Sequence, residues 1–230
     1  MGQFTKGERH SHERGGGLST LWFTSDTHFD HAAVLRHSDR PWDDVGEMNA
    51  AIIDNWNANV GPKDTVWHLG DVHFRSDSDA TSWLERLHGY IWVLRGNHDS
   101  ERELDESVSV GAIEGWAHVK YLRHNSKKFW LSHYPHRSWQ GSNRSENSTS
   151  HLFGHSHGDL TVPRGRLMDV GVDAVARWLA TRRDSEANRT TIPFDGVRPE
   201  GYRPIGFDEV VGWLEGEPPT NQHGQGRGSP

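Results

Sequence analysis

The residues best suited to chemistry in this chain are aspartate, asparagine and histidine, and they gather in five short clusters. Their donor atoms are carboxylate or amide oxygens and imidazole nitrogens. The sequence has no cysteine, which excludes thiolate ligands, disulfides and cysteine nucleophiles. Such a donor set suits manganese, iron, zinc, cobalt or nickel better than copper(I) or an iron–sulfur cluster. The clusters are Asp26-Thr27-His28, Gly70-Asp71, Gly96-Asn97-His98-Asp99, His133 and Gly154-His155-Ser156-His157.

The number and spacing of these donors indicate two metal ions. In Asp26-x-His28 and His155-x-His157 the paired side chains are two residues apart, which in extended backbone places them on one face. Two aspartates, one asparagine and four histidines exceed one tetrahedral zinc site. With one shared carboxylate they divide into two centres, as in sites whose ions lie roughly 3.5–4 Å apart. Each cluster alone is also common as a turn, a cap or a structural histidine, but their joint occurrence favours a metal centre.

The elements that must position these clusters are short apolar strands, because each cluster follows a predicted strand. In the first half, strands alternate with segments of helical periodicity, which predicts parallel strands joined by crossover helices. Open α/β sheets bind ligands at the carboxyl ends of such strands. The second half is mostly strand after strand, with a hairpin turn near Asn125-Ser126. The whole predicts an α/β sandwich with helices outside. The predicted strands are 21–24, 65–69, 90–94, 119–122, 128–131, 151–153 and 167–170, and the predicted helices are 45–59, 80–88 and 207–214.

The length of 230 residues fits one folded domain with polar ends. Residues 1–17 and 218–230 are predicted to be a disordered arm and tail, which leaves residues 18–217 as the domain. The net charge of −7 argues against stable binding to nucleic acid or to an anionic membrane. No apolar run approaches the ~20 residues of a membrane helix, and the first residues do not resemble a signal peptide. A soluble, cytoplasmic protein is expected.

The ordered series D-x-H, G-D, G-N-H-D, H and G-H-x-H resembles that of the calcineurin-like metallophosphoesterase family. The resemblance spans about Leu21 to Asp173 and is strongest to the small bacterial and phage-type phosphoesterases, through Ser25-Asp26-Thr27-His28-Phe29-Asp30-His31 and Leu69-Gly70-Asp71-Val72. It implies a four-layer α/β/β/α sandwich with mixed sheets. It implies one ion bound by Asp26, His28, Asp71 and His157, a second bound by Asp71, Asn97, His133 and His155, and His98 as an acid beside the leaving group.

The chemistry of the residue types agrees with these implied roles. A carboxylate has two oxygens, so Asp71 can bridge two ions, while the neutral amide of Asn97 limits the negative charge around them. Two ions lower the pKa of a water between them, so that a hydroxide can attack phosphorus in line. His98 is free to donate a proton because its neighbour Asn97 is the ligand. Asp99 either orients the His98 imidazole or caps the following helix, and both interpretations stay open.

Four further residues are candidates for substrate contact. His31 follows the first cluster closely enough to contact the phosphate. Arg75 lies four residues after the second cluster, where protein phosphatases of the superfamily carry a phosphate-binding arginine, although the acidic residue before it and the glycine after it are missing. His136 is placed to line the substrate mouth, and Trp139, in a polar loop, to stack on a nucleobase. His68, by contrast, is predicted to be a buried, hydrogen-bonded strand residue.

The chain departs from the family pattern in one segment of about 28 residues, 174–201. It separates Val170-Gly171-Val172-Asp173 from a closing segment, Tyr202-Arg203-Pro204-Ile205. This predicted insert is interpreted as a flexible loop, a cap or a partner surface. Its five arginines are Arg177, Arg182, Arg183, Arg189 and Arg198.

The sequence therefore predicts a dinuclear metal-dependent phosphoesterase, with manganese favoured. The preferred substrates are small phosphodiesters such as cyclic or other nucleotides, since 230 residues leave no room for the large capping domain of a macromolecular nuclease. A phosphomonoesterase, including a protein phosphatase, is the alternative. A non-catalytic interaction scaffold is disfavoured because the implied ligands and His98 are all present. The oligomeric state is not determined.

Overall fold

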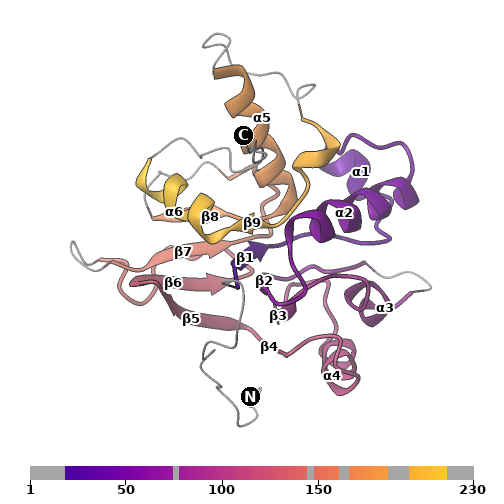
Figure 1. Ribbon diagram of the computed structural model, residues 1–230, viewed down its shortest axis with the longest axis horizontal. Coiled ribbons are helices and arrows are strands. Elements are labelled where there is room, and N and C mark those ends of the chain that lie inside the picture. Colours follow the sequence, from indigo (N-terminus) through magenta and orange to yellow (C-terminus); the bar gives the residue numbers. More distant parts are fainter. Residues whose placement is uncertain (1–18, 75–77, 144–147, 161–165, 186–196, 217–230) are drawn as a thin grey trace, which may run out of the picture.

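The computed structural model describes residues 19–74, 78–143, 148–160, 166–185 and 197–216. The predicted arm 1–17 and tail 218–230 lie outside these residues, and so does the middle of the predicted insert. The described chain forms two mixed sheets with helices on both sides (Figure 1). This arrangement confirms the predicted α/β fold class with mixed sheets between helices. No helix among the described residues has the length and apolar character needed to cross a bilayer.

The five-stranded sheet brings the ends of its parallel strands to one edge. Its order is β4-β3-β2-β1-β9, with β9 antiparallel to β1 and the other neighbours parallel. Thr24, the last residue of β1, pairs with His68, the last residue of β2, and His68 pairs with Val93 of β3. The residues that follow these strands therefore meet at one place. The strands are β1 (Leu21–Thr24), β2 (Thr65–His68), β3 (Tyr90–Leu94), β4 (Gly115–Ala117) and β9 (Ile205–Gly206).

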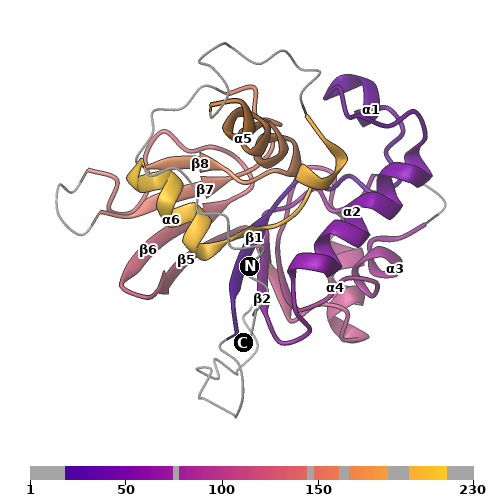
Figure 2. The same cartoon turned by 45° about the horizontal axis from the view of Figure 1, so that its top comes forward.

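Helices cover the face of this sheet that points away from the second sheet (Figure 2). The longest begins after Asp44, whose carboxylate accepts hydrogen bonds from the backbone N–H groups of Gly46 and Glu47 and so caps the helix. Met48 and Ile52 are buried at the predicted helical spacing. The helices on this side are α1 (Val34–His37), α2 (Val45–Asn59), α3 (Ala80–Leu84) and α4 (Glu101–Ser109).

The four-stranded sheet begins with the predicted hairpin. Strands β5 and β6 are antiparallel, and Asn125 and Ser126 between them have left-handed backbone, with φ of 44° and 64°. This conformation matches the twist of a tight hairpin. The remaining neighbours, β6–β7 and β7–β8, are parallel. The strands are β5 (Val119–His124), β6 (Lys127–Ser132), β7 (Ser150–Phe153) and β8 (Leu167–Asp169).

Two apolar cores hold the layers together, and strand alternation divides the side chains between them. On β2, Val66 packs under the helices while Trp67 packs between the sheets. On β3, Ile91 packs under the helices and Leu94 packs between the sheets. Phe129 of β6 lies in the core between the sheets, 5.6 Å from the ring of Phe23 in the sheet above it. The strand ends that carry the clusters are thus anchored on both faces.

The structure contains elements that the sequence did not predict. Helix α5 (Val172–Ser185) runs into the predicted insert, and its Val175 and Ala176 are buried. The first part of the insert is therefore part of the folded core and is not a flexible loop, while its interpretation as a cap or a partner surface stays a prediction. A 3-10 helix, η2 (Pro199–Gly201), was also not predicted, whereas helix α6 (Phe207–Glu215), packed against β1, β8 and β9, matches the predicted helix at 207–214.

Candidate metal centre

Three of the five clusters leave their strands through left-handed backbone. The φ angles are 58° at Asp26, 50° at His28, 56° at Asp71, 67° at His155 and 48° at His157. A non-glycine residue in this region is strained by roughly 1–3 kcal/mol, and such residues concentrate at functional sites because the surrounding structure must enforce them. Extended backbone was predicted for Asp26-x-His28 and His155-x-His157, and this prediction is wrong. The side chains converge because the chain turns at each of them.

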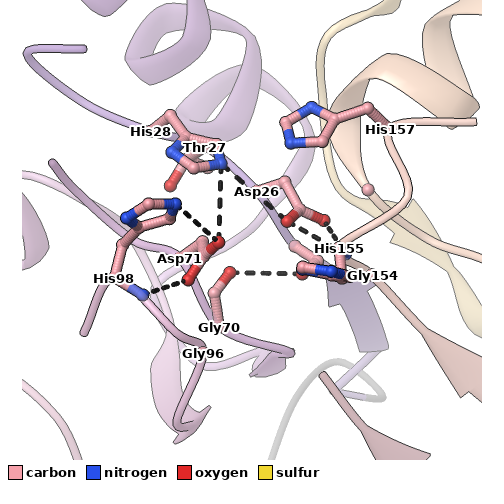
Figure 3. Close-up of polar contacts among 12 residues, drawn as sticks. Asp26, Thr27, His28, Gly70, Asp71, Gly96, His98, Gly154, His155 and His157 are labelled. Atoms are coloured by element: carbon pink, nitrogen blue, oxygen red, sulfur yellow. Dashed lines mark hydrogen bonds and ion pairs between the residues drawn. The ribbon is translucent and has the colours of Figure 1, made fainter. Parts of the chain in front are cut away.

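The first group of donors consists of Asp26, His28 and His157. One ligand atom from each lies within 4.8 Å of the others. The two imidazoles stack with their centroids 5.1 Å apart and their planes at 23°. Nε2 of His28 lies 4.0 Å from Oδ1 of Asp26. Figure 3 shows both rings on the carboxylate side of Asp26, which itself is fully buried.

The second group consists of Asp71, His133 and His155, again with donor atoms within 4.8 Å of one another. Nδ1 of His133 donates to the backbone carbonyl of Leu69 at 2.9 Å, so Nε2 is the ring nitrogen that faces the donor group. That Nε2 lies 3.4 Å from Oδ2 of Asp71 and 3.0 Å from Oδ1 of Asn97. The amide oxygen of Asn97 therefore belongs to this group.

Asp71 joins the two groups. Its Oδ2 lies 3.6 Å from Nε2 of His28 in the first group and 3.4 Å from Nε2 of His133 in the second. Its Oδ1 accepts the backbone N–H of His98 at 2.9 Å, and the His98 imidazole stands 3.9 Å from Oδ2 (Figure 3). The structure brings all seven sequence-predicted ligands together, with Asp71 in the position predicted for a bridge. Their coordination of ions stays a prediction.

One buried nitrogen atom indicates whether a cation fits between the donor residues. Nε2 of His28 has no hydrogen-bond partner, although it is buried and faces Asp71 and Asp26. Burial lowers the pKa of His28 well below its ordinary range, and the charge of Arg40 lowers it further, so the ring is neutral and one of its two nitrogens carries a lone pair. A neutral imidazole lone pair among carboxylates is a metal ligand without its partner. The donor set therefore fits a divalent cation.

The pKa values of residues in the two groups are shifted, because these residues are buried and interact with one another. Burial raises the pKa of Asp26 to about 7, although His133 and His157 act in the opposite direction. Burial by itself would lower the pKa of His133, but its hydrogen bond to Asp71 and the charge of Asp26 raise it to about 9. A divalent cation would satisfy the same lone pairs without protons, so binding at this centre is coupled to proton release.

Two glycines permit the close approach of the strand ends. A Cβ at Gly96 would lie 2.1 Å from Oδ1 of Asp71, and a Cβ at Gly154 would lie 2.0 Å from Oγ of Ser25 and 2.5 Å from Oδ2 of Asp26. These distances are far below van der Waals contact. Any larger residue at either position would displace a carboxylate that faces the centre.

Asp99 neither orients the His98 imidazole nor caps the following helix, the two interpretations that the sequence left open. Its Oδ2 accepts the backbone N–H groups of Asp71 and Gly96 at 2.8 Å, and its Oδ1 accepts that of Val72 at 2.9 Å. The residue before helix α4 is Ser100, so Asp99 is not the cap. The buried carboxylate instead ties the loop after β3 to the loop after β2. We assign it a positioning function in place of the predicted contact with the His98 imidazole.

Of the candidates for substrate contact, His31 lies beside the centre. Its Nδ1 is 3.3 Å from Nδ1 of His28, and its ring stacks on Phe74 at 3.9 Å. The Phe74 ring in turn meets the His98 ring at 4.8 Å, which forms an aromatic wall on that side. Contact of His31 with substrate stays a prediction, and Arg75 lies outside the described residues.

His136 and Trp139 pack elsewhere, on the outer face of the four-stranded sheet. Nδ1 of His136 accepts the indole N–H of Trp130 at 3.0 Å, and its backbone N–H donates to His151 at 2.9 Å. The Trp139 ring lies 5.1 Å from that of His151, and its indole N–H donates to the carbonyl of Thr149 at 2.8 Å. Packing contacts thus replace the predicted substrate-lining and base-stacking contacts.

Sequence reasoning missed several residues around the centre. Asp169 accepts hydrogen bonds from Ser156 Oγ and the backbone N–H of Gly158, which holds the loop of the last cluster. Tyr134, with an exposed fraction of 46%, places its ring 4.6 Å from that of His155. Arg40 and Asp173 form a buried ion pair. No spacing motif marked these residues, because their partners lie far away in the sequence.

The predicted buried, hydrogen-bonded state of His68 is confirmed. Its Nδ1 accepts the backbone N–H of Gly70, so Nε2–H donates to Oγ1 of Thr27 at 3.0 Å. That hydroxyl donates to the carbonyl of Val72 at 2.7 Å. The neutral ring therefore links β2 to the loop that carries Asp26 and His28. Burial lowers the pKa of His68 to about 3.

This shift predicts acid sensitivity of the fold. Between the unfolded pKa of roughly 6.5 and the folded pKa of about 3, the unfolded chain binds a proton at His68 that the folded chain does not. The free energy of unfolding must fall as pH falls, by about 1.4 kcal/mol per pH unit for this group. The free energy of unfolding is measured by urea unfolding between pH 6 and 4 with chelator present. In His68→Gln its dependence on pH should be shallower, by the amount that corresponds to about one proton. The exposed His118→Gln serves as control, and an identical slope in wild type and His68→Gln would contradict the prediction.

Two mixed sheets with paired Asp/His groups at the strand ends define a metallophosphoesterase-type architecture. Residues 20–170 match the family described as the calcineurin-like phosphoesterase superfamily domain. This match covers well over half of the chain, and the chain belongs to that superfamily. The recognition made from the five clusters is therefore confirmed.

Similar proteins extend this finding. The chain is 36% identical over 124 residues to an uncharacterised protein of Methanocaldococcus jannaschii, a match that covers 53% of this chain and 62% of that protein. It is 27% identical over 194 residues to the gene 66 protein of Mycobacterium phage L5, covering 71% of this chain and 91% of the phage protein. A solved structure of a protein of unknown function from Aquifex aeolicus shares the fold, with a TM-score of 0.54, 20% identity and coverage of 84% and 98%.

Proposed function

We propose that this chain is a dinuclear metal-dependent phosphodiesterase that hydrolyses small diesters, including nucleotides. The observation that carries the proposal is the position of Asp71, whose Oδ2 lies 3.6 Å from His28 of one donor group and 3.4 Å from His133 of the other. Two groups that share a carboxylate are the arrangement required for two neighbouring cations. Membership of the calcineurin-like phosphoesterase superfamily supports a hydrolase of phosphoesters.

The donor chemistry decides which residues would hold each ion. Oxygen and imidazole donors without sulfur suit manganese, iron, zinc, cobalt or nickel, and among these we propose manganese. When bound, the two cations would activate a water for attack on phosphorus and offset charge on the phosphoryl oxygens. The first ion would be held by Asp26, His28, His157 and Asp71, and the second by Asp71, Asn97, His133 and His155.

His98 is the residue best placed to hand a proton to the leaving group. Its backbone N–H is fixed on Oδ1 of Asp71 at 2.9 Å, while its side chain is 34% exposed beside the aromatic ring of Phe74. The imidazole is thus anchored at its base and open at its tip. In this position it can donate to an oxygen that departs from phosphorus.

The charge of the centre favours a diester over a monoester. A monoester dianion carries more negative charge, and proteins usually match it with guanidinium groups. The buried guanidinium near this centre belongs to Arg40, and all of its N–H groups bind protein atoms. Other described residues beside the two groups offer imidazoles and the Tyr134 hydroxyl, which carry less positive charge than a guanidinium, so a monoanionic diester fits them better.

The assay compares two chromogenic substrates on manganese-loaded protein. Bis-p-nitrophenyl phosphate should be hydrolysed with a higher kcat/KM than p-nitrophenyl phosphate, and chelator should abolish both activities. A screen of cyclic and linear nucleotide diesters then narrows the substrate class. A strong monoester preference would reverse the proposed specificity, and absence of any manganese-dependent hydrolysis would overturn the function.

A further inference from the structure

Arg40 is buried and uses every hydrogen-bond donor it has. Nε and Nη2 donate to the two carboxylate oxygens of Asp173 at 2.9 and 2.8 Å. Nη2 also donates to the backbone carbonyl of Asp26 at 2.7 Å, and Nη1 donates to that of Thr27 at 2.9 Å and to Sδ of Met48 at 3.3 Å. A guanidinium has five N–H groups, and these contacts account for all of them. A lysine could not reproduce this fork.

Asp173, at the start of helix α5, stands between this guanidinium and the centre. Its Oδ2 lies 2.7 Å from Nδ1 of His157, and its side chain is 1% exposed. Ser38 Oγ also lies 3.1 Å from the same nitrogen. The carboxylate can only accept, so Nδ1 of His157 is the donor and carries a proton. The free lone pair of the ring is then on Nε2, the nitrogen left to face the donor group of Asp26 and His28.

The same guanidinium therefore acts on both sides of the first donor group. On one side it holds the backbone carbonyls of Asp26 and Thr27, which directly precede His28. On the other side it fixes the carboxylate that orients His157. The strained φ angles of 58°, 50° and 48° at Asp26, His28 and His157 need an external restraint. The pair binds the carbonyl of Asp26, the Thr27 carbonyl that precedes His28, and the ring of His157.

We propose that the buried Arg40–Asp173 pair consists of two positioning residues that set the tautomer and direction of His157 and the backbone of Asp26 and His28, and so tune the affinity of one of the two cation sites. This inference rests on the proposed function, because it treats the first donor group as a metal site. Neither residue contacts substrate. Both act through the ligands, as carboxylates that orient ligand histidines do elsewhere.

A pair present only for stability would behave differently. Buried ion pairs contribute little net stability, and a neutral pair of similar volume often replaces them without loss. The double variant Arg40→Met/Asp173→Asn leaves no unpaired buried charge, so the fold should be retained. Its asparagine has no carboxylate for the His157 ring, and its methionine has no donors for the carbonyls of Asp26 and Thr27. Metal affinity should therefore fall although the fold persists.

The test titrates manganese(II) into chelator-stripped protein by calorimetry. Wild type should bind two ions. In the double variant, one ion should bind about 10- to 100-fold more weakly while the other is unchanged. The matched control is Asp159→Asn, because Asp159 is an exposed carboxylate paired with Arg177 at 2.7 Å. This control should titrate like wild type.

A second measurement needs no variant. In the zinc-loaded wild type, nitrogen-15 NMR should place the His157 proton on Nδ1, protected from exchange with solvent, and the metal-shifted signal on Nε2. Wild-type affinities for both ions in the folded double variant, or a His157 proton on Nε2, would overturn the proposal. If the double variant does not fold, the NMR result decides. A wild type that binds no ion would overturn the proposed function instead, so the two failures are distinguishable.

Discussion

Asp71→Ala should abolish hydrolysis and remove the paired metal occupancy. The carboxylate is the shared member of the two donor groups, with Oδ2 3.6 Å from His28 and 3.4 Å from His133. Its loss removes the carboxylate of the second group and leaves Asp26 as the carboxylate of the first. The expected fall in kcat/KM exceeds about a thousandfold, which corresponds to roughly 4 kcal/mol of transition-state stabilisation. Elemental analysis after manganese loading and gel filtration should find less than the two ions expected for wild type.

Two comparisons separate the charge of Asp71 from its shape. Asp71→Asn keeps the size of the side chain and an oxygen that can accept the His98 backbone N–H, now held at 2.9 Å. It should nevertheless lose most of the activity, because the bridging charge is gone. Asp105→Asn, which alters an exposed carboxylate bound to the Trp116 indole, should change neither quantity. Full turnover with two ions in Asp71→Ala would eliminate the bridging role.

The convergence of the clusters could be predicted because it depends on short-range patterns. The strands predicted at 21–24, 65–69 and 90–94 match β1, β2 and β3, and neighbouring parallel strands end at one edge. Any donor placed directly after such a strand reaches the same region. The order of the clusters then sufficed to identify the superfamily that the match over residues 20–170 confirms.

The way the donors reach that region was not predictable from spacing. Extended backbone was expected at Asp26-x-His28, whereas both residues have positive φ. An aspartate or histidine has no local preference strong enough to announce this conformation. It is imposed by partners distant in the sequence, such as the Arg40 guanidinium on the Asp26 carbonyl and the Asp99 carboxylate on the Asp71 backbone.

Polar residues outside the clusters were assigned poorly for the same reason. His136 and Trp139 have the chemistry of substrate contacts, but they pack with His151 on the outer face of the second sheet. Asp173 had no motif of its own, yet it contacts Arg40, which lies 133 positions away. Short elements such as β4 and β9 carry too few residues for a period to be detected.

His98→Ala should keep both ions and slow hydrolysis by roughly 10²–10⁴-fold, the range for loss of a positioned proton donor. The side chain is not among the grouped donors. The hydrogen bond of His98 to the Asp71 carboxylate is through the backbone N–H, which alanine retains, and the imidazole lies 3.9 Å from that carboxylate. Metal content should therefore match wild type, while kcat falls more than KM rises.

The dependence of the rate loss on the leaving group distinguishes proton donation by His98 from electrostatic stabilisation of the transition state. A donor matters most when the departing oxygen is a poor leaving group, because such an oxygen must be protonated as it leaves. His98→Ala should therefore slow an alkyl diester far more than a p-nitrophenyl diester, whose leaving group is stable as an anion. His118→Ala, at an exposed histidine that lies 3.7 Å from Glu101, should affect neither substrate. An equal loss on both diesters would mean that the His98 imidazole stabilises charge on the phosphoryl group and transfers no proton, and an unchanged rate would remove it from the mechanism.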